Sequence, residues 1–251
     1  MDLGLGGRGY LLTGASRGLG FATARALVDD GARVLVSSRS ADGVASAVSQ
    51  LGSGAFGLAA DLSDAEAAGR LVAESLERLG RLDGALISVG GPAPGGVFDV
   101  SEENWRTAVE SVLLGPIRLV KALVPHLDDG ASIGFVLSGS ARQPLDGLAI
   151  SNGLRPGLAM TAKSLSDELA PRGIRVVGLL PGTIATDRVT ELEDASGDPS
   201  DARARTEAGI PLGRVGQPEE FGRVAAFMLS PAASYVTGTS IVIDGGRLRT
   251  P

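Results

Sequence analysis

The strongest chemical signal in the sequence is a glycine-rich turn near the amino terminus. Three glycines, Gly14, Gly18 and Gly20, follow a short apolar run and precede a segment with helical apolar spacing. Glycines at this spacing let the backbone turn tightly, let a pyrophosphate approach the start of a helix, and let that helix pack closely on the strand. The turn therefore predicts a dinucleotide site, and its predicted cofactor contacts are Gly14, Ser16, Arg17, Gly18, Leu19 and Gly20.

The residues that would select the dinucleotide follow the second predicted strand. An acid at this place accepts hydrogen bonds from the adenosine ribose of NAD, whereas this chain has Ser38 and Arg39. A guanidinium can pair with a 2′-phosphate through charge-assisted hydrogen bonds, and Arg17 of the glycine turn could assist. The sequence therefore predicts NADP(H) as the cofactor, with a solvated surface charge as the alternative reading of Arg39.

Composition argues against several other kinds of chemistry. The 251 residues contain no cysteine and a single histidine, His126, so we expect no thiolate nucleophile, no metal site and no Ser-His-Asp triad. The net charge of -6 gives no positive field for nucleic acid or an anionic bilayer. The sequence shows neither a signal peptide nor a membrane span, so we expect a cytoplasmic protein without nucleic-acid or membrane partners.

Apolar runs alternate with helical patterns along the chain and indicate the fold. Strands are predicted over residues 10–13, 32–37, 55–60, 84–89, 133–137, 174–180 and 240–243. Helices are predicted over residues 21–28, 43–51, 65–79, 102–127, 154–170 and 219–229. This alternation predicts an α/β fold, a Rossmann-type doubly wound parallel sheet of about seven strands with helices on both faces.

No linker or change of composition divides the chain, so we expect residues 1–251 to form a single domain. The least regular part covers residues 183–209, where polar residues, glycine and proline interrupt any apolar pattern. We expect this part to be either a substrate lid or a plain surface excursion.

Several motifs, read together, resemble the short-chain dehydrogenase/reductase family, in particular its β-ketoacyl-carrier-protein-reductase-like members. They lie at residues 13–20, 61–63, 181–186, 210–214, 235–238 and 244–246, nearly from end to end of the chain. The resemblance implies that the subunits assemble as a homotetramer or homodimer. It also implies cofactor contacts by Asp61 and Leu62 at the adenine, by Ile184 and Thr186 at the nicotinamide carboxamide, and by Gly90, Pro181 and Gly182.

The catalytic positions depart from the family's pattern. The family's acid/base pair resembles Tyr-x-x-x-Lys, but Tyr10 is followed four residues later by Gly14, and Tyr235 by Thr239. These are the two tyrosines of the chain, so the motif does not occur in it.

Counting back from residues 173–176, which resemble the family's helix-to-strand junction, shows what replaces the motif. Ser151 stands at the position of the tyrosine and Arg155 at that of the lysine, while Ser138, thirteen residues before Ser151, keeps the family's serine. Similar counting places Val112 at the family's asparagine. The resemblance therefore implies Ser138, Ser151 and Arg155 as the catalytic positions.

These replacements change the chemistry that the positions can perform. A phenol near pKa 10 can exchange a proton with a carbonyl oxygen, whereas a serine hydroxyl is too weak an acid without a relay. Arg155 stays cationic and can hold ribose hydroxyls or stabilise an alkoxide. Ser151 and Arg155 share one helix face, which favours a retained function, although a helix-start serine and a solvated arginine remain the alternative. For Ser138 the alternative is a turn hydrogen bond.

The leading hypothesis is an NADPH-dependent reductase that delivers hydride to a ketone or quinone-like carbonyl, with the proton supplied by water or by the substrate. A second hypothesis is an isomerase, dehydratase or cyclase that uses the same pocket without net redox. A third is a catalytically inactive NADP(H)-binding protein. The nucleotide turn and the missing phenol suit all three.

Overall fold

The central strands are apolar along their length, and the structure buries them on both faces. The computed structural model describes residues 2–194 and 197–250, and in it every residue of β1 (Gly9–Thr13), β4 (Gly84–Ile87) and β5 (Ser132–Val136) is buried. The strands of this part form one seven-stranded parallel sheet in the order β3-β2-β1-β4-β5-β6-β7. The remaining strands are β2 (Arg33–Ser38), β3 (Ala55–Ala59), β6 (Arg175–Pro181) and β7 (Thr239–Ile243). The predicted Rossmann-type sheet is confirmed, with each strand within two residues of its predicted ends.

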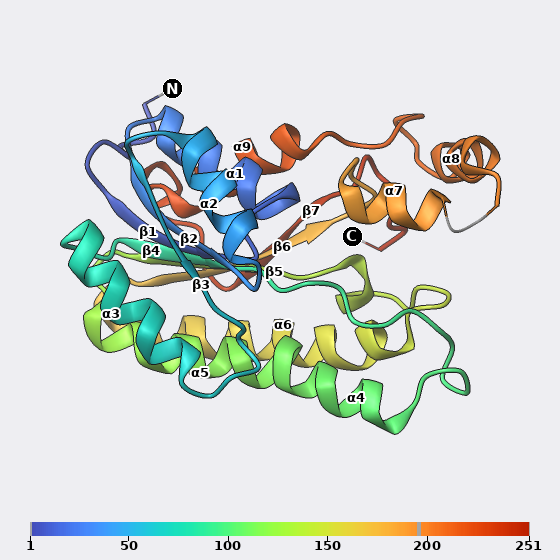
Figure 1. The fold of residues 1–251 in the computed structure, drawn as a ribbon, viewed down its shortest axis with the longest axis horizontal. Coiled ribbons are helices and arrows are strands. Elements are labelled where there is room, and N and C mark those ends of the chain that lie inside the picture. Colours follow the sequence, from blue (N-terminus) through green and yellow to red (C-terminus); the bar gives the residue numbers. More distant parts are fainter. Residues whose placement is uncertain (1, 195–196, 251) are drawn as a thin grey trace.

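Helices cover both faces of the sheet (Figure 1). On one face lie α1 (Gly18–Asp29), α2 (Ala41–Leu51) and α9 (Pro218–Leu229). On the other face lie α3 (Ala67–Leu79), α4 (Glu102–Ala108), α5 (Gly115–Leu123) and α6 (Ala149–Leu169). Each face has its own core, one around Leu71, Leu119 and Phe135 and the other around Leu27, Val36 and Phe221.

Two predicted helices differ from the structure in their details. The pattern over residues 102–127 is a rod in which a π-helix (Val109–Leu114) separates α4 from α5, and a 3-10 turn (Val124–His126) ends it. Helix α6 begins five residues before the predicted start at residue 154. Its first turns contain Gly153 and Pro156, which hide the helical pattern, but Ile150 and Leu154 pack on the π-helix and stabilise the early start.

The irregular segment over residues 183–209 contains two helices that the sequence pattern did not indicate. They are α7 (Asp187–Asp194) and α8 (Pro199–Ala208), while residues 195 and 196 of this segment lie outside the described residues. Helix α8 buries none of its described residues, so no apolar stripe could reveal it. Asp198 and Pro199, which suggest a loop, are its N-cap and first residue, and the Asp198 carboxylate accepts the N–H of Asp201.

The remaining helical elements are three single 3-10 turns, which cover Gly139–Ala141, Ala170–Arg172 and Pro231–Ala233. Among residues 2–194 and 197–250, no helix combines the length and the apolar character that crossing a bilayer requires.

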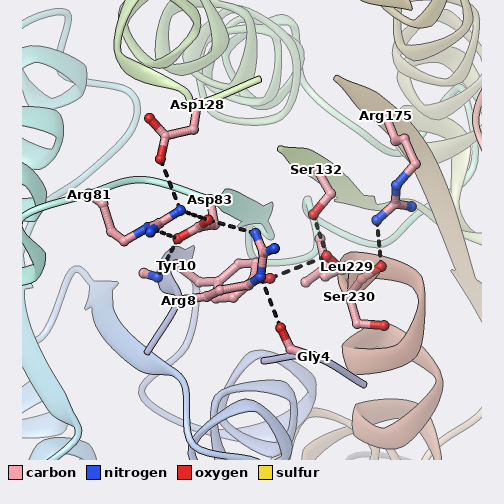
Figure 2. Close-up of polar contacts among 11 residues, drawn as sticks. Gly4, Arg8, Tyr10, Arg81, Asp83, Asp128, Ser132, Arg175, Leu229 and Ser230 are labelled. Atoms are coloured by element: carbon pink, nitrogen blue, oxygen red, sulfur yellow. Dashed lines mark hydrogen bonds and ion pairs between the residues drawn. The ribbon is translucent and has the colours of Figure 1, made fainter. Parts of the chain in front are cut away.

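A buried carboxylate ties β1 to β4 at the amino ends of the strands (Figure 2). The Asp83 side chain is 1% exposed and precedes β4 directly. Its oxygens accept the backbone N–H of Gly9 at 2.9 Å, the Arg8 guanidinium at 2.7 Å and the Arg81 guanidinium at 2.6 Å. The two guanidinium groups compensate the buried negative charge of Asp83. The hydrogen bond from the Gly9 N–H, at the start of β1, aligns β1 with β4.

Tyr10 lies in the same region, far from the carboxyl ends of the strands. Its ring is buried and its hydroxyl donates to the carbonyl of Leu229, which also accepts the Ser132 hydroxyl at 2.6 Å (Figure 2). Arg175 donates to the carbonyls of Met228 and Ser230 beside it. Tyr10 therefore has a structural role, in which β1 is joined to the end of α9.

Alkaline pH should destabilise the fold through Tyr10. Burial raises the pKa of Tyr10 to about 12, so the folded protein favours the neutral phenol, whereas the unfolded chain ionises near pH 10. This contribution is complete below about pH 10 and is lost as the pH rises toward about 12, at a cost of roughly 3 kcal/mol. Denaturant unfolding across this range should show the decline, and Tyr10→Phe should flatten it.

The matched control is Tyr235→Phe, because the Tyr235 side chain is fully exposed. This variant should keep the decline of the unmodified protein. An equally steep alkaline loss in Tyr10→Phe would contradict the assignment to Tyr10.

Candidate active site

The glycine turn joins β1 to α1 at the carboxyl ends of the strands. Gly14 and Gly18 have φ of +57° and +58°, in the left-handed region that favours glycine. A Cβ on Gly14 would lie 2.7 Å from the Ser88 carbonyl oxygen, and one on Gly20 would lie 2.4 Å from the Gly14 carbonyl oxygen. The backbone can follow this path only with glycine at these positions.

The turn lies over the seam between β1 and β4, where the strand order reverses. The Thr13 hydroxyl donates to the Ser88 carbonyl at 2.8 Å and accepts the Ser88 N–H at 3.0 Å, which joins the two strand ends. In open α/β sheets, ligands bind in the crevice at such a reversal point. The predicted site therefore has the position that a dinucleotide requires.

The local chemistry fits a dinucleotide pyrophosphate. Arg17 is the N-cap of α1 and makes no capping hydrogen bond, and the first turn of α1 holds no acid. By contrast, the Ser40 hydroxyl caps α2 by accepting the N–H of Gly43. A Cβ on Gly90 would meet no atom within 4 Å, so the β4 side of the crevice is open. A phosphate at α1 would therefore find a positive helix end without a competing side chain.

The two arginines proposed for the 2′-phosphate have different surroundings. Arg39 is exposed beyond β2, and no carboxylate within the described ranges forms an ion pair with it. The Arg17 guanidinium lies 3.1 Å from the Asp187 carboxylate and 3.6 Å from that of Glu191, both on α7. Arg39 is thus available to an anion, whereas Arg17 already pairs with the predicted lid.

The remaining predicted cofactor positions lie in the turn and at the end of β2. A Cβ on Gly43 would lie 3.5 Å from the Ser16 Cβ, so the turn abuts the start of α2. The Ser38 hydroxyl reaches the Ser40 carbonyl at 3.5 Å, and Leu19 packs at the border of the core. These residues surround the place where an adenosine ribose would lie.

The positions inferred from resemblance are distributed around the crevice. The Asp61 carboxylate accepts the N–H and the hydroxyl of Ser63, each at 2.9 Å, and Leu62 is buried. Ile184 is also buried, and its side chain contributes to the core. The Thr186 methyl group lies 3.4 Å from a Cβ built on Gly18, which brings the start of α7 against the glycine turn.

Pro181 ends β6, and Gly182, the next residue, lies beside the end of β7. The Gly182 N–H donates to the Ile243 carbonyl at 2.9 Å, and a Cβ on Gly182 would lie 2.5 Å from the Asp244 Cβ. This close approach requires glycine and brings the segment after β7 beside the segment after β6.

Hydrogen bonds link three serines between the end of β5 and the start of α6. The Ser138 hydroxyl accepts the N–H of Ser140 at 3.2 Å, and the Ser140 hydroxyl lies 2.9 Å from that of Ser151. Ser140 therefore connects Ser138 to Ser151, and these two hydrogen bonds include none directly between Ser138 and Ser151. The sequence showed Ser140 only as another hydroxyl two residues beyond Ser138, and its role depends on the 3-10 turn that aims it at Ser151.

Ser151 does not cap α6. It is the third residue of the helix and is buried, and the N-cap, Leu148, makes no side-chain hydrogen bond. Ser151 therefore lies at the start of the helix, as the alternative reading expected, but it does not cap the helix, because its hydroxyl bonds to Ser140.

Arg155 follows Ser151 by one helical turn in α6 and is buried. Its side chain is 4% exposed, and its Nη1 donates to the Val136 carbonyl of β5 at 2.7 Å, while its buried Nε has no partner. No carboxylate in residues 2–194 and 197–250 pairs with it, and burial lowers the pKa of Arg155 to about 10. The solvated reading of Arg155 is therefore wrong, and the site contains an uncompensated buried cation.

An apolar residue occupies the position inferred for the family's asparagine. Val112, at the position inferred for an asparagine, lies within the π-helix and packs with Ile150 and Leu154. Neither tyrosine approaches the site, since Tyr10 lies at the amino end of β1 and Tyr235 is an exposed residue before β7. The site thus combines hydroxyls and one cation with an apolar side and no phenol.

Comparisons with known proteins show the family and the fold of the chain. The chain matches the family model described as enoyl-(acyl carrier protein) reductase over residues 14–247. It is 35% identical over 245 residues to the human dehydrogenase/reductase SDR family member 4, a match that covers 94% of this chain and 86% of the relative.

Two solved structures resemble the whole fold. The L-sorbose reductase of Gluconobacter frateurii, complexed with NADPH and L-sorbose, superposes with a TM-score of 0.93 at 28% identity and covers 100% of both chains. A short-chain oxidoreductase of Pseudomonas aeruginosa described as containing an atypical catalytic center has a TM-score of 0.90 at 28% identity, covering 97% of this chain and 98% of its own.

Proposed function

Because this chain belongs to the short-chain dehydrogenase/reductase family of oxidoreductases, we propose that it is an NADPH-dependent reductase of a ketone or quinone-like carbonyl. The observations that carry the proposal are the hydrogen-bonded pair of Ser140 and Ser151 and the buried Arg155 one helical turn after Ser151, which follow the carboxyl end of β5 as the glycine turn follows that of β1. Such a group can bind a carbonyl oxygen and stabilise negative charge that develops on it.

NADP(H) is the cofactor that the charges favour. Arg39 is an exposed cation without an ion-pair partner among the described residues, at the strand end where NAD-selective proteins place an acid. Arg17 could contribute only by leaving Asp187 and Glu191. One guanidinium is therefore available to the 2′-phosphate without any rearrangement.

NADPH should bind at least about tenfold more tightly than NADH, because one good guanidinium–phosphate contact contributes roughly 1.5–3 kcal/mol. Arg39→Ala should remove most of this difference, measured as two dissociation constants by calorimetry. Arg106→Ala, which removes an exposed arginine of α4, is the control and should leave both constants unchanged. Equal constants for the two cofactors in the unmodified protein would refute the assignment.

The chain's own residues would act on the substrate oxygen. NADPH, when bound, supplies the hydride. Ser138 and Ser151 would hydrogen-bond the carbonyl oxygen, with Ser140 orienting the Ser151 hydroxyl. Arg155 would hold a ribose hydroxyl and stabilise the forming alkoxide with its unpaired N–H and its charge.

The proton would come from water or from the substrate. A serine hydroxyl ends roughly 4 Å short of the oxygen of a tyrosine at the same position, which leaves room for one water molecule or a substrate hydroxyl. Arg155 retains its proton at neutral pH even with a pKa lowered to about 10. Substrates with an acidic hydroxyl near the carbonyl are therefore favoured, and the pH profile should follow that hydroxyl.

Substitution at Ser151 and Arg155 separates positioning from proton transfer. Ser151→Ala should lower kcat by less than roughly 10²-fold, which is less than the loss of an essential general acid. Arg155→Ala should lower both NADPH affinity and kcat. Steady-state kinetics and cofactor titration measure these effects, with circular dichroism as the check on folding. Complete loss of turnover in a folded, NADPH-binding Ser151→Ala protein would show that the serine itself relays the proton.

The missing phenol also favours a second candidate, an isomerase, dehydratase or cyclase without net redox. A screen of aromatic and acyl-thioester ketones with NADPH, followed by cofactor absorbance and product mass, distinguishes the candidates. Product without cofactor oxidation supports the second candidate. NADPH binding without any product supports an inactive binding protein.

We also propose a cytoplasmic homodimer or homotetramer. Met160, on α6, is an apolar side chain that is 67% exposed, and Tyr235 is exposed before the edge strand β7. A second subunit could cover these residues. Light scattering at micromolar concentration should give a multiple of 25.3 kDa, and a monomeric mass would exclude this part of the proposal.

A further inference from the structure

The segment after β7 turns back across the carboxyl ends of the strands. Both carboxylate oxygens of Asp244 hold this turn, one accepting the Gly246 N–H at 2.8 Å and the other the Leu248 N–H at 2.7 Å. The Arg247 guanidinium donates to the Thr183 hydroxyl, which fastens the segment to the one that follows β6. Residues 244–248 are therefore an ordered turn rather than a loose tail.

This turn places Leu248 directly on the serine loop. A Cβ built on Gly139 would lie 3.2 Å from one Leu248 methyl carbon and 3.6 Å from the other. Gly139 is the residue between Ser138 and Ser140, so the leucine side chain lies against the backbone that presents both hydroxyls. Leu248 is half-buried, which leaves part of the side chain open to a ligand.

We propose that residues 244–248 form one wall of the substrate pocket and that Leu248 limits the apolar substituent beside the reacting carbonyl. This inference rests on the proposed function, because Ser138 marks where the carbonyl would bind. Leu248 presents methyl groups at this point, so the wall takes an alkyl or aryl substituent better than a hydroxylated one. The substrate class is accordingly an apolar ketone.

The length of this substituent should be set by the volume of residue 248. Leu248→Ala removes the methyl groups next to Gly139 and should raise kcat/KM for the longest members of an aryl alkyl ketone series by about tenfold. Leu248→Phe should lower kcat/KM for the same ketones by a similar factor. NADPH affinity should stay within about twofold in both variants, because neither changes the glycine turn or Arg39.

Arg249→Ala is the matched control, since its exposed side chain follows Leu248 in the same segment. It should leave the ketone profile unchanged. The proposal is overturned if Leu248→Ala and Leu248→Phe both keep the ketone profile of the unmodified protein.

A second readout does not depend on turnover. The chain contains no cysteine, so Leu248→Cys creates a unique thiol whose modification by a maleimide can be timed by mass spectrometry. With NADPH present, butyrophenone should slow modification at position 248 by at least about fivefold and leave Glu77→Cys, on the exposed surface of α3, unaffected.

The two readouts separate the wall from the proposed reaction. Protection at position 248 without ketone reduction would support the wall and contradict the reductase. Ketone reduction without protection at position 248 would overturn the wall and leave the reductase intact. Absence of both overturns the wall as well.

Discussion

The seam between β1 and β4 is the constraint on which the rest of the molecule depends. Asp83 fixes it at the amino ends, where its buried carboxylate accepts the Gly9 N–H and two guanidinium groups. Thr13 fixes it at the carboxyl ends through two hydrogen bonds to Ser88. With both ends held, the glycine turn leaves β1 at a defined height above the sheet, and the strands on either side take their register from this pair. The cofactor crevice is a consequence of that alignment.

Most of the fold could be predicted from the sequence because buried parallel strands are continuous apolar runs, bounded here by glycine and by polar residues. Helices α7 and α8 could not be predicted in this way. Both are polar helices. Helix α8 is capped by Asp198, and α7 pairs with Arg17 of the glycine turn, a contact between distant parts of the chain that local sequence does not encode. The early start of α6 could not be predicted for a related reason, since Ile150 is buried by residues distant in the chain, among them Val112 of the π-helix.

The candidate site was predictable in position but not in its bonding. Counting along the chain located Ser138, Ser151 and Arg155, yet Ser140 links the serines only through the geometry of a 3-10 turn. The burial of Arg155 was equally invisible, because arginine normally lies at the surface. A buried guanidinium without a carboxylate partner costs stability, and here the Val136 carbonyl accepts one of its N–H groups.

The first and the last described residues lie near opposite ends of the strands, and this has a practical consequence for handling the protein. Gly4 contacts Arg8 near the amino end of β1 (Figure 2), whereas the turn at residues 244–248 follows the carboxyl end of β7 and contacts Gly139. A purification tag fused beyond residue 251 would therefore begin within a few residues of the turn that contacts Gly139. Kinetic work belongs with protein tagged at the amino end, or with a tag removed by a protease before assay.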